Sequence, residues 1–297
     1  IHSPKGRAML LREWLLQVTR QVRLEKANKS SNKDKSSKTN ASGSKELILK
    51  FLIKPINFIL PRTWTLNGFF QSQDFSHQVY KAMHGCLGCK ACASSCPVKV
   101  NIPHMKAKFL HSYHGKFGRS WQDYMIAGYE TMYRFRKRFP IITKFVMDNR
   151  FTGFFIDKVV GIADLPRVKR GYCRKSRIWG NRSKRIVKKM KSSGKLVFIL
   201  DDPFNSLYDA DIIEKTLKVL ESLGYTVFLL SIPTPGIVKH SLGMMDDFKK
   251  SCQSNIKILN EVSKVGAPIL CVEPSVSLFI NEDYKRNFPG KCNFKVE

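Results

Sequence analysis

Four cysteines lie within eleven residues of this 297-residue chain, and their type and spacing make them the side chains best suited to chemistry. Residues 86–97 read Cys-Leu-Gly-Cys-Lys-Ala-Cys-Ala-Ser-Ser-Cys-Pro, which is the pattern C-x2-C-x2-C-x3-C-P. Two-residue spacers let a tightly wound loop turn successive thiolates toward one small volume, and such a run is typical of [4Fe–4S] cluster ligands. The residues that we predict to bind the iron of this cofactor are Cys86, Cys89, Cys92 and Cys96.

The residues between the cysteines support the same interpretation. Gly88 and Ala91 should keep the loop thin enough for backbone amides to approach the cluster, and Pro97 should stop the loop from continuing as a helix. Zinc is one alternative, but zinc ligands usually form two close pairs across a longer gap. Disulfide bonds are the other, and they need an oxidising compartment that nothing in the sequence indicates.

Cys96 leaves two arrangements open. In ferredoxins with two clusters, the fourth cysteine of such a run binds the other cluster. This chain has one run of this kind. Either all four cysteines hold one cluster, which we favour, or Cys96 serves a second cluster whose other ligands lie outside the chain.

The chain is strongly basic, with 52 Lys and Arg against 23 Asp and Glu and a formal net charge of +29. Such an excess favours contact with an anionic neighbour. Residues 165–200 hold 13 Lys or Arg and no acid, yet only Tyr172 and Trp179 there could stack on bases. Specific nucleic-acid binding is therefore not expected, and an acidic neighbouring domain or anionic lipid is the better match.

The hydrophobic pattern divides the chain into a helical part and a part that alternates strands with helices. Helices are predicted over 3–24, 46–60, Phe75–His84 and 120–163, and over a segment after Asn101, which should cap it. From residue 195 onward, strands at 196–200, 225–230 and 268–272 alternate with helices at 209–223 and 246–265. This alternation predicts βαβ units and a parallel sheet.

Other residues that could do chemistry receive ordinary structural interpretations. The sequence after the first strand is Asp201-Asp202-Pro203 rather than a glycine-rich loop, which argues against dinucleotide binding and predicts that the two aspartates cap strand and helix ends. The histidines near the cysteine run are read as helix-face residues: His77, His84, His104, His111 and His114. The remaining thiols are read as packed or solvent-facing: Cys173, Cys252, Cys271 and Cys292.

Three passages resemble the C-terminal part of large dehydrogenases of the D-2-hydroxyglutarate and D-lactate type, which contain FAD and iron–sulfur clusters. The first passage is HSPKGRA at 2–8 with REWL at 12–15. The second runs from FSH at 75–77 through the cysteine motif to MKAKFL at 105–110, and the third is DPFNSLYDA at 202–210 followed by EPS at 273–275. The resemblance implies that the four motif cysteines are cluster ligands.

The resemblance also implies a function and partners. In that family an FAD-binding domain oxidises a D-2-hydroxy acid, so this chain is expected to pass electrons from FAD, on a missing N-terminal domain, through the cluster to a quinone or electron carrier. The flavin domain would be joined in cis or be a separate chain. The Cys-Cys-Gly motif of related cysteine-rich domains is absent, and Val276 stands where those domains often have cysteine. A second metal site in 195–297 is therefore not expected.

Together these observations predict an α plus α/β protein. The expected parts are an N-terminal helix (1–26), a polar low-complexity linker (27–45), a helical ferredoxin-like [4Fe–4S] domain (46–164), a basic connector (165–194) and a three-layer α/β domain with a parallel sheet, truncated at its C-terminus (195–297). The expected location is cytoplasmic, with or without peripheral contact at the inner membrane face. The alternatives are a non-redox basic binding module with a structural cluster, or a non-functional fragment.

Overall fold

The computed structural model of the 297-residue chain describes residues 3–31, 74–139, 179–180, 195–232 and 234–297. These residues belong to two compact units. The first unit comprises residues 1–126 and 240–245, and the second comprises 127–239 and 246–297. Within the described residues, no helix is long and apolar enough to cross a membrane.

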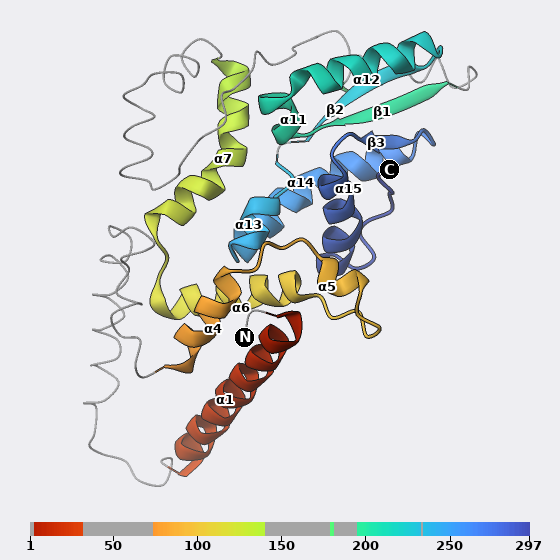
Figure 1. Cartoon of the computed structure of the whole chain (residues 1–297). Helices are drawn as coiled ribbons and strands as arrows, with labels where there is room; N and C mark the ends of the chain where they lie inside the picture. Colours follow the sequence, from red (N-terminus) through yellow and green to blue (C-terminus); the bar gives the residue numbers. More distant parts are fainter. Residues whose placement is uncertain (1–2, 32–73, 140–178, 181–194, 233) are drawn as a thin grey trace. The chain divides into compact units, whose positions relative to one another are not determined.

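Helices are the main secondary structure of the first unit in the residues that the structure describes. They are α1 (Pro4–Ser31), α4 (Phe75–His84), α5 (Ala91–Ser94), α6 (Ile102–Phe117) and the first residues of α7 (Trp121–Arg138) (Figure 1). Helices α1, α4 and α6 pack on one another around a shared apolar core. The buried residues of that core are Leu11, Val79, Met83, Ile102, Phe109, Leu110 and Tyr113.

Side-chain caps fix where α4 and α6 begin. The Asp74 carboxylate accepts a hydrogen bond from the Ser76 amide (2.8 Å), and Asn101 Oδ1 accepts one from the His104 amide (3.0 Å). Each cap satisfies an amide that has no partner inside its helix. The predicted Asn101 cap and the predicted bounds of α4 are confirmed. Burial acts to raise the pKa of Asp74, but hydrogen bonds from Lys116 and Ser76 outweigh it and lower that pKa.

The helix at the N-terminus is longer than the sequence pattern suggested. It was expected to end near residue 24, with a polar linker from residue 27, but α1 continues to Ser31. Adding a residue to an existing helix costs much less than starting one, so polar residues of modest helix propensity can extend it. The predicted helix at 46–60, most of the basic connector and the second half of the 120–163 helix lie outside the described residues.

The second unit contains a three-stranded parallel sheet, as predicted. Its strands are β1 (Leu196–Asp201), β2 (Thr226–Ser231) and β3 (Ile269–Cys271), in the order β2-β1-β3. In the register, Phe198 of β1 lies opposite Phe228 of β2 and Ile269 of β3. Strand β1 is therefore central, which explains why five of its six residues are buried.

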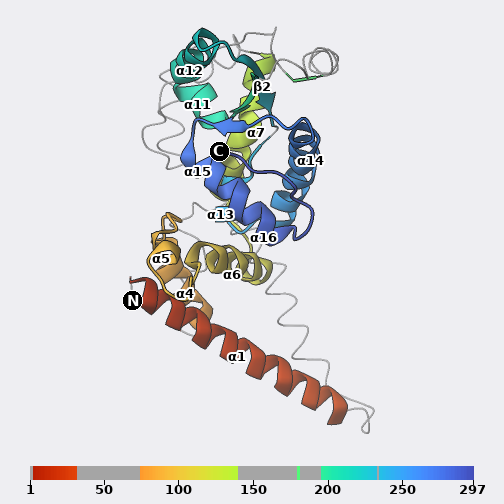
Figure 2. The same ribbon diagram turned by 90° about the vertical axis from the view of Figure 1, so that its right-hand side faces the viewer.

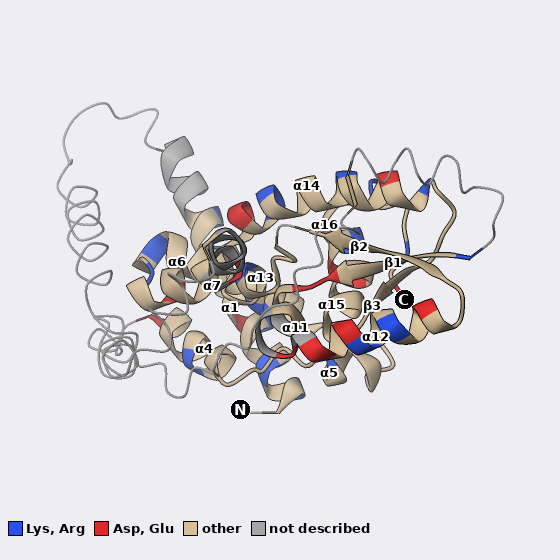
Figure 3. Ribbon diagram, turned by 90° about the horizontal axis from the view of Figure 1, so that it is seen from above, with Lys and Arg blue, Asp and Glu red and all other residues tan. Residues whose placement is uncertain are grey.

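Helices cover both faces of this sheet. Figures 2 and 3 show α12 (Ala210–Ser222) on one side and α14 (Met245–Ser263) on the other. This is the three-layer arrangement expected from alternating strands and helices. The core beneath α12 consists of Ile199, Ile213, Leu217, Val227 and Leu229. The shorter helices are α11 (Pro203–Tyr208), α13 (Ile237–Ser241), α15 (Pro274–Phe279), a π-helical turn (Ile280–Tyr284) and α16 (Lys285–Asn287).

A buried carboxyl group on α7 joins two segments of the second unit. Glu130 has no exposed surface, and its two carboxylate oxygens accept hydrogen bonds from the amides of Gly236 and Val238, both at 3.1 Å. Burial raises the pKa of Glu130, and the two amide donors reduce that shift without reversing it. The contact fixes the segment that leads into α13 against α7.

The thiols outside the cysteine motif are packed, as expected, where the structure describes them. Cys252 is fully buried, and its burial raises its pKa well above the ordinary thiol value. Burial also raises the pKa of Cys271 to about 12. Cys292 is half-buried, and Cys173 lies outside the described residues. Thiols with raised pKa values stay protonated at neutral pH and are poor metal ligands.

Gly243 allows residues 240–245 to pack closely on α6 within the first unit. Its φ is +71°, and a Cβ there would lie 2.6 Å from Leu110 Cβ, 2.7 Å from the His111 amide nitrogen and 2.9 Å from the Ala107 carbonyl oxygen. Two of these three atoms belong to the backbone of α6 and cannot move aside. The position therefore requires glycine for space as well as for conformation.

Replacing Gly243 with alanine should loosen this packing. Gly266→Ala is the matched control, because Gly266 has a similar φ of +78° with nothing within 4 Å of the added carbon. We expect Gly243→Ala to cost about 1–3 kcal/mol more unfolding free energy than the control, since overpacking adds to the backbone strain that both share. Urea unfolding and hydrogen exchange of α6 peptides measure this difference. Equal losses in the two variants would contradict the close approach.

Candidate metal centre

The cysteine motif lies in the segment 86–100, which connects α4 to α6 in the first unit and contains the short helix α5. Three residues of this segment have left-handed backbone conformations: Gly88 (φ +76°), Lys90 (φ +60°) and Lys99 (φ +52°). Glycine adopts this region without cost, but lysine does not, and strained conformations of this kind concentrate at functional sites. An added Cβ at Gly88 would meet nothing within 4 Å, so space does not require glycine there. Its left-handed backbone conformation does.

The four predicted ligands differ in their surroundings. Cys86 and Cys92 are partly buried and pack against the apolar core of the first unit. Cys89 is exposed, and Cys96 has intermediate exposure. The segment therefore has one side anchored on the core and one side open to solvent, which is how a cofactor near a protein surface would be held.

Backbone amides gather around the sulfur of Cys96. Hydrogen bonding by the backbone amides of Val100, Val98 and Lys99 lowers the pKa of this thiol. The cause is that an N–H donor stabilises the thiolate more than the thiol. A thiolate is the form that binds iron, so a lowered pKa at this position favours the metal-binding form of the side chain.

Arg7 of α1 holds the residues that lead into the motif. Its Nε donates to the carbonyl oxygen of Ala82 (3.1 Å), and its Nη2 donates to that of Gly85 (3.0 Å). Both carbonyls lie at the end of α4, where helical carbonyls lack partners within the helix. The two bonds thereby fix the end of α4 immediately before Cys86.

Lys106 provides a second contact to the start of the segment. Its Nζ donates to the carbonyl oxygen of Cys86 at 2.7 Å from the second turn of α6. The contacts of Arg7 and Lys106 were not predictable from the sequence. Arg7 lies 75 and 78 residues from its two partners, and no spacing rule connects positions so far apart.

The residues present fit an iron–sulfur cluster. The donor set is four soft thiols, and backbone amides lower the pKa of one of them, Cys96. No Asp or Glu occurs between residues 75 and 118, so no hard carboxylate ligand competes within this part of the sequence. A set of thiolates without carboxylates suits iron–sulfur clusters, and zinc as the alternative, rather than calcium or magnesium.

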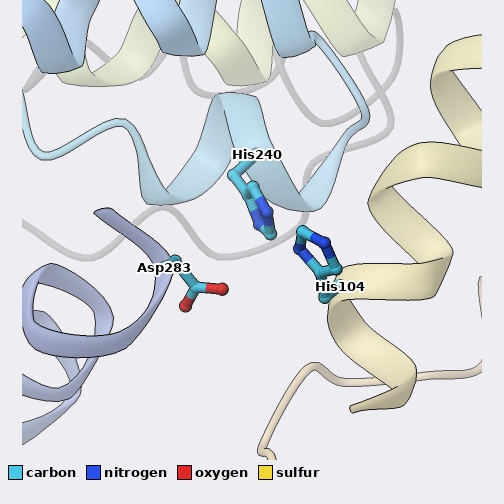
Figure 4. A group of neighbouring side chains, drawn as sticks. All are labelled: His104, His240 and Asp283. Carbon is cyan, nitrogen blue, oxygen red and sulfur yellow. The ribbon is translucent and has the colours of Figure 1, made fainter. Parts of the chain in front are cut away.

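His77 and His104, two of the histidines near the motif, have ring contacts in the structure. His77 is buried, its Nδ1 lies 2.8 Å from the Tyr113 hydroxyl, and burial lowers its pKa. The rings of His104 and His240, both in the first unit, stack with centroids 6.0 Å apart (Figure 4). Asp283, also drawn in Figure 4, belongs to the second unit, where it is buried.

The aspartate pair after β1 serves as a cap, as predicted. The Asp202 carboxylate accepts hydrogen bonds from the amide (3.0 Å) and the side chain (2.9 Å) of Asn205, at the start of α11. The Ser206 hydroxyl donates to Asp201. The carboxyl end of the central strand is therefore occupied by its own carboxylates, which would repel a phosphate.

Comparison with known proteins supports the resemblance seen in the sequence. Over 98% of its length, the chain is 31% identical to the D-2-hydroxyglutarate dehydrogenase of Haemophilus influenzae. It is 30% identical to the proteins of the same name from Pantoea ananatis and Escherichia coli K12, over 96% of its length in each case. These proteins are homologues of the chain.

The similarity has clear bounds. The chain spans 27% of the length of each of these relatives. No family model matches the chain, and no solved structure matches it. The expected relation to D-2-hydroxyglutarate dehydrogenases is confirmed at this level, whereas the assignment of the four cysteines to a cluster stays a prediction.

Removing the Arg7 contacts should weaken the site without touching a cysteine. We expect Arg7→Ala to lower the unfolding free energy by about 1–3 kcal/mol, the usual value for hydrogen bonds from a charged group. It should also speed iron loss from the reconstituted chain to a chelator. Arg7→Lys should fall between, because lysine lacks the planar two-donor fork. Arg20→Ala, an exposed position on the same helix, is the control, and an identical loss there would contradict the anchoring role.

Proposed function

We propose that the chain is the electron-transfer part of a flavin-dependent D-2-hydroxyacid dehydrogenase and that it binds one [4Fe–4S] cluster through Cys86, Cys89, Cys92 and Cys96. The cysteine segment carries this proposal: its spacing suits the cluster, and its structure combines an anchored side with an open side. When bound, the cluster would supply one-electron transfer between a two-electron donor and an acceptor.

The homologues support the substrate class. They are named D-2-hydroxyglutarate dehydrogenases, and oxidation of a hydroxy acid requires an acceptor for a hydride or its equivalent. The described residues offer no glycine-rich dinucleotide loop after β1, where aspartates stand instead. FAD on another domain, joined to this chain or separate from it, is therefore the proposed hydride acceptor. D-2-hydroxyglutarate and D-lactate are the candidate substrates.

The residues of the chain would hold and tune the cofactor rather than react with substrate. Arg7 and Lys106 fix the backbone on which Cys86 stands, and the left-handed Gly88 and Lys90 turn the chain between successive cysteines. Amide donors at Cys96 stabilise negative charge on a ligand sulfur, and such donors raise a cluster's reduction potential. The acceptor beyond the cluster is proposed to be a quinone or a soluble electron carrier.

Anaerobic reconstitution with iron and sulfide tests the cofactor. We expect about four irons per chain and an EPR signal of a reduced [4Fe–4S] cluster after dithionite treatment. In a separate sample with the cluster still oxidised, visible absorbance should bleach on addition of photoreduced free flavin. This result tests the electron-transfer role. A cluster that binds fully but takes no electron from flavin would support the alternative of a structural cluster in a basic binding module.

Replacing one ligand should remove the cluster. We expect Cys89→Ser to lose the visible absorbance and most of the iron, because a neutral hydroxyl is a poor ligand for this type of cluster. Cys292→Ser is the matched control, since Cys292 is a half-buried thiol of the second unit. Full absorbance and iron content in Cys89→Ser would overturn the ligand assignment.

A further inference from the structure

The two most exposed large apolar side chains among the described residues lie in the cysteine segment. Leu87, next to Cys86, is 95% exposed, and Val98, two residues after Cys96, is 80% exposed. Single exposed apolar residues are common and need no explanation. These two, however, adjoin the first and last cysteines of one motif. When four thiolates close around one cofactor, both side chains must lie near it.

The sequence around this segment carries charge of one sign. Residues 75–118 contain six lysines and no Asp or Glu. Asp74, the acid just before them, is paired with Lys116 at 2.7 Å, and hydrogen bonds from Lys116 help to keep it ionised. Lys99, within the cysteine segment itself, is exposed. The two exposed apolar residues therefore lie in a stretch of sequence with net positive charge.

We propose that Leu87 and Val98, with the lysines around them, form the docking surface for an acidic flavoprotein domain that delivers electrons to the cluster. This inference rests on the proposed function and adds the surface and the chemistry of the partner. An apolar centre within a charged rim is the usual anatomy of a weak, fast interface, in which charge steers the encounter and apolar contact fixes the short-lived complex.

The position of the surface suits its task. Cys89 is exposed, so a cluster bound at the motif would have an edge close to solvent and to a docked protein. After docking, a reduced flavin on the partner would lose one electron and an oxidised cluster held by the four cysteines would gain it, while any proton released by the flavin would go to solvent. A partner rich in Asp and Glu is favoured over a basic one, because like charges would oppose the encounter.

The experiment measures how fast a protein donor reduces the reconstituted full chain. The donor is a photoreduced flavodoxin chosen for its acidic surface, and reduction is followed by stopped-flow absorbance. Leu87→Gln removes the apolar contact, and Val98→Thr nearly keeps side-chain shape while adding a hydroxyl. Leu24→Gln is the matched control, because Leu24 is 64% exposed on α1 and lies about 25 Å along that helix from Arg7.

We expect Leu87→Gln to slow reduction by flavodoxin about tenfold at low salt, which corresponds to about 1.4 kcal/mol. Val98→Thr should slow it less, and Leu24→Gln should leave it unchanged. Iron content, EPR signal and reduction by dithionite should be unchanged in Leu87→Gln and Leu24→Gln, because dithionite needs no docking surface. Raising ionic strength from about 10 to about 150 mM should slow the flavodoxin reaction as screening shortens from about 30 to about 8 Å.

The outcomes separate this inference from the function on which it rests. A chain that binds no cluster, or a cluster that neither dithionite nor free flavin reduces, would overturn both. A cluster that both small donors reduce, with equal flavodoxin rates for Leu87→Gln and Leu24→Gln, would overturn the docking surface alone. Two other results would also overturn the docking surface, if the flavodoxin rate stayed unchanged. One is self-association of the chain that Leu87→Gln abolishes. The other is binding to phosphatidylserine vesicles that Leu87→Gln abolishes.

Discussion

A single guanidinium group between α1 and α4 fixes the place where the cysteine segment begins. The carbonyls at the end of α4 need donors that the helix cannot supply, and Arg7 supplies two of them in the plane of its fork. The segment that follows is exposed along much of its length and contains two lysines in left-handed conformations. The position at which it leaves α4 therefore depends on α1, although that helix is distant in sequence.

The carboxyl end of the parallel sheet is occupied differently here than in a nucleotide-binding α/β protein. In open parallel sheets, ligands usually bind at the carboxyl ends of the strands. Here Asp201 and Asp202 fill that end of the central strand and bond to Asn205 and Ser206 of the helix that follows. The aspartates at the end of the sheet thus bond to the helix that follows, whereas the cysteines suited to a cofactor lie in the first unit.

Patterns of local origin were predictable, and contacts between distant residues were not. The parallel sheet, the bounds of α4 and the cap at Asn101 follow from periodicity and capping rules that act over a few residues. The end of α1 was misplaced because propensity is a weak guide once a helix has started. Arg7, Lys106 and the close approach at Gly243 depend on tertiary packing, for which one sequence offers no signal.

The buried carboxyl group of Glu130 couples folding of the second unit to proton uptake. Because burial raises its pKa in the folded chain, the folded state binds more protons than the unfolded state at pH values between the ordinary glutamate pKa and the raised one. Folding in that window takes up protons, and the contribution of this group to stability declines as pH rises through it. The buffer gives up those protons, and its ionisation enthalpy adds to the measured heat of folding. Calorimetry in buffers of different ionisation enthalpy would therefore give different apparent enthalpies.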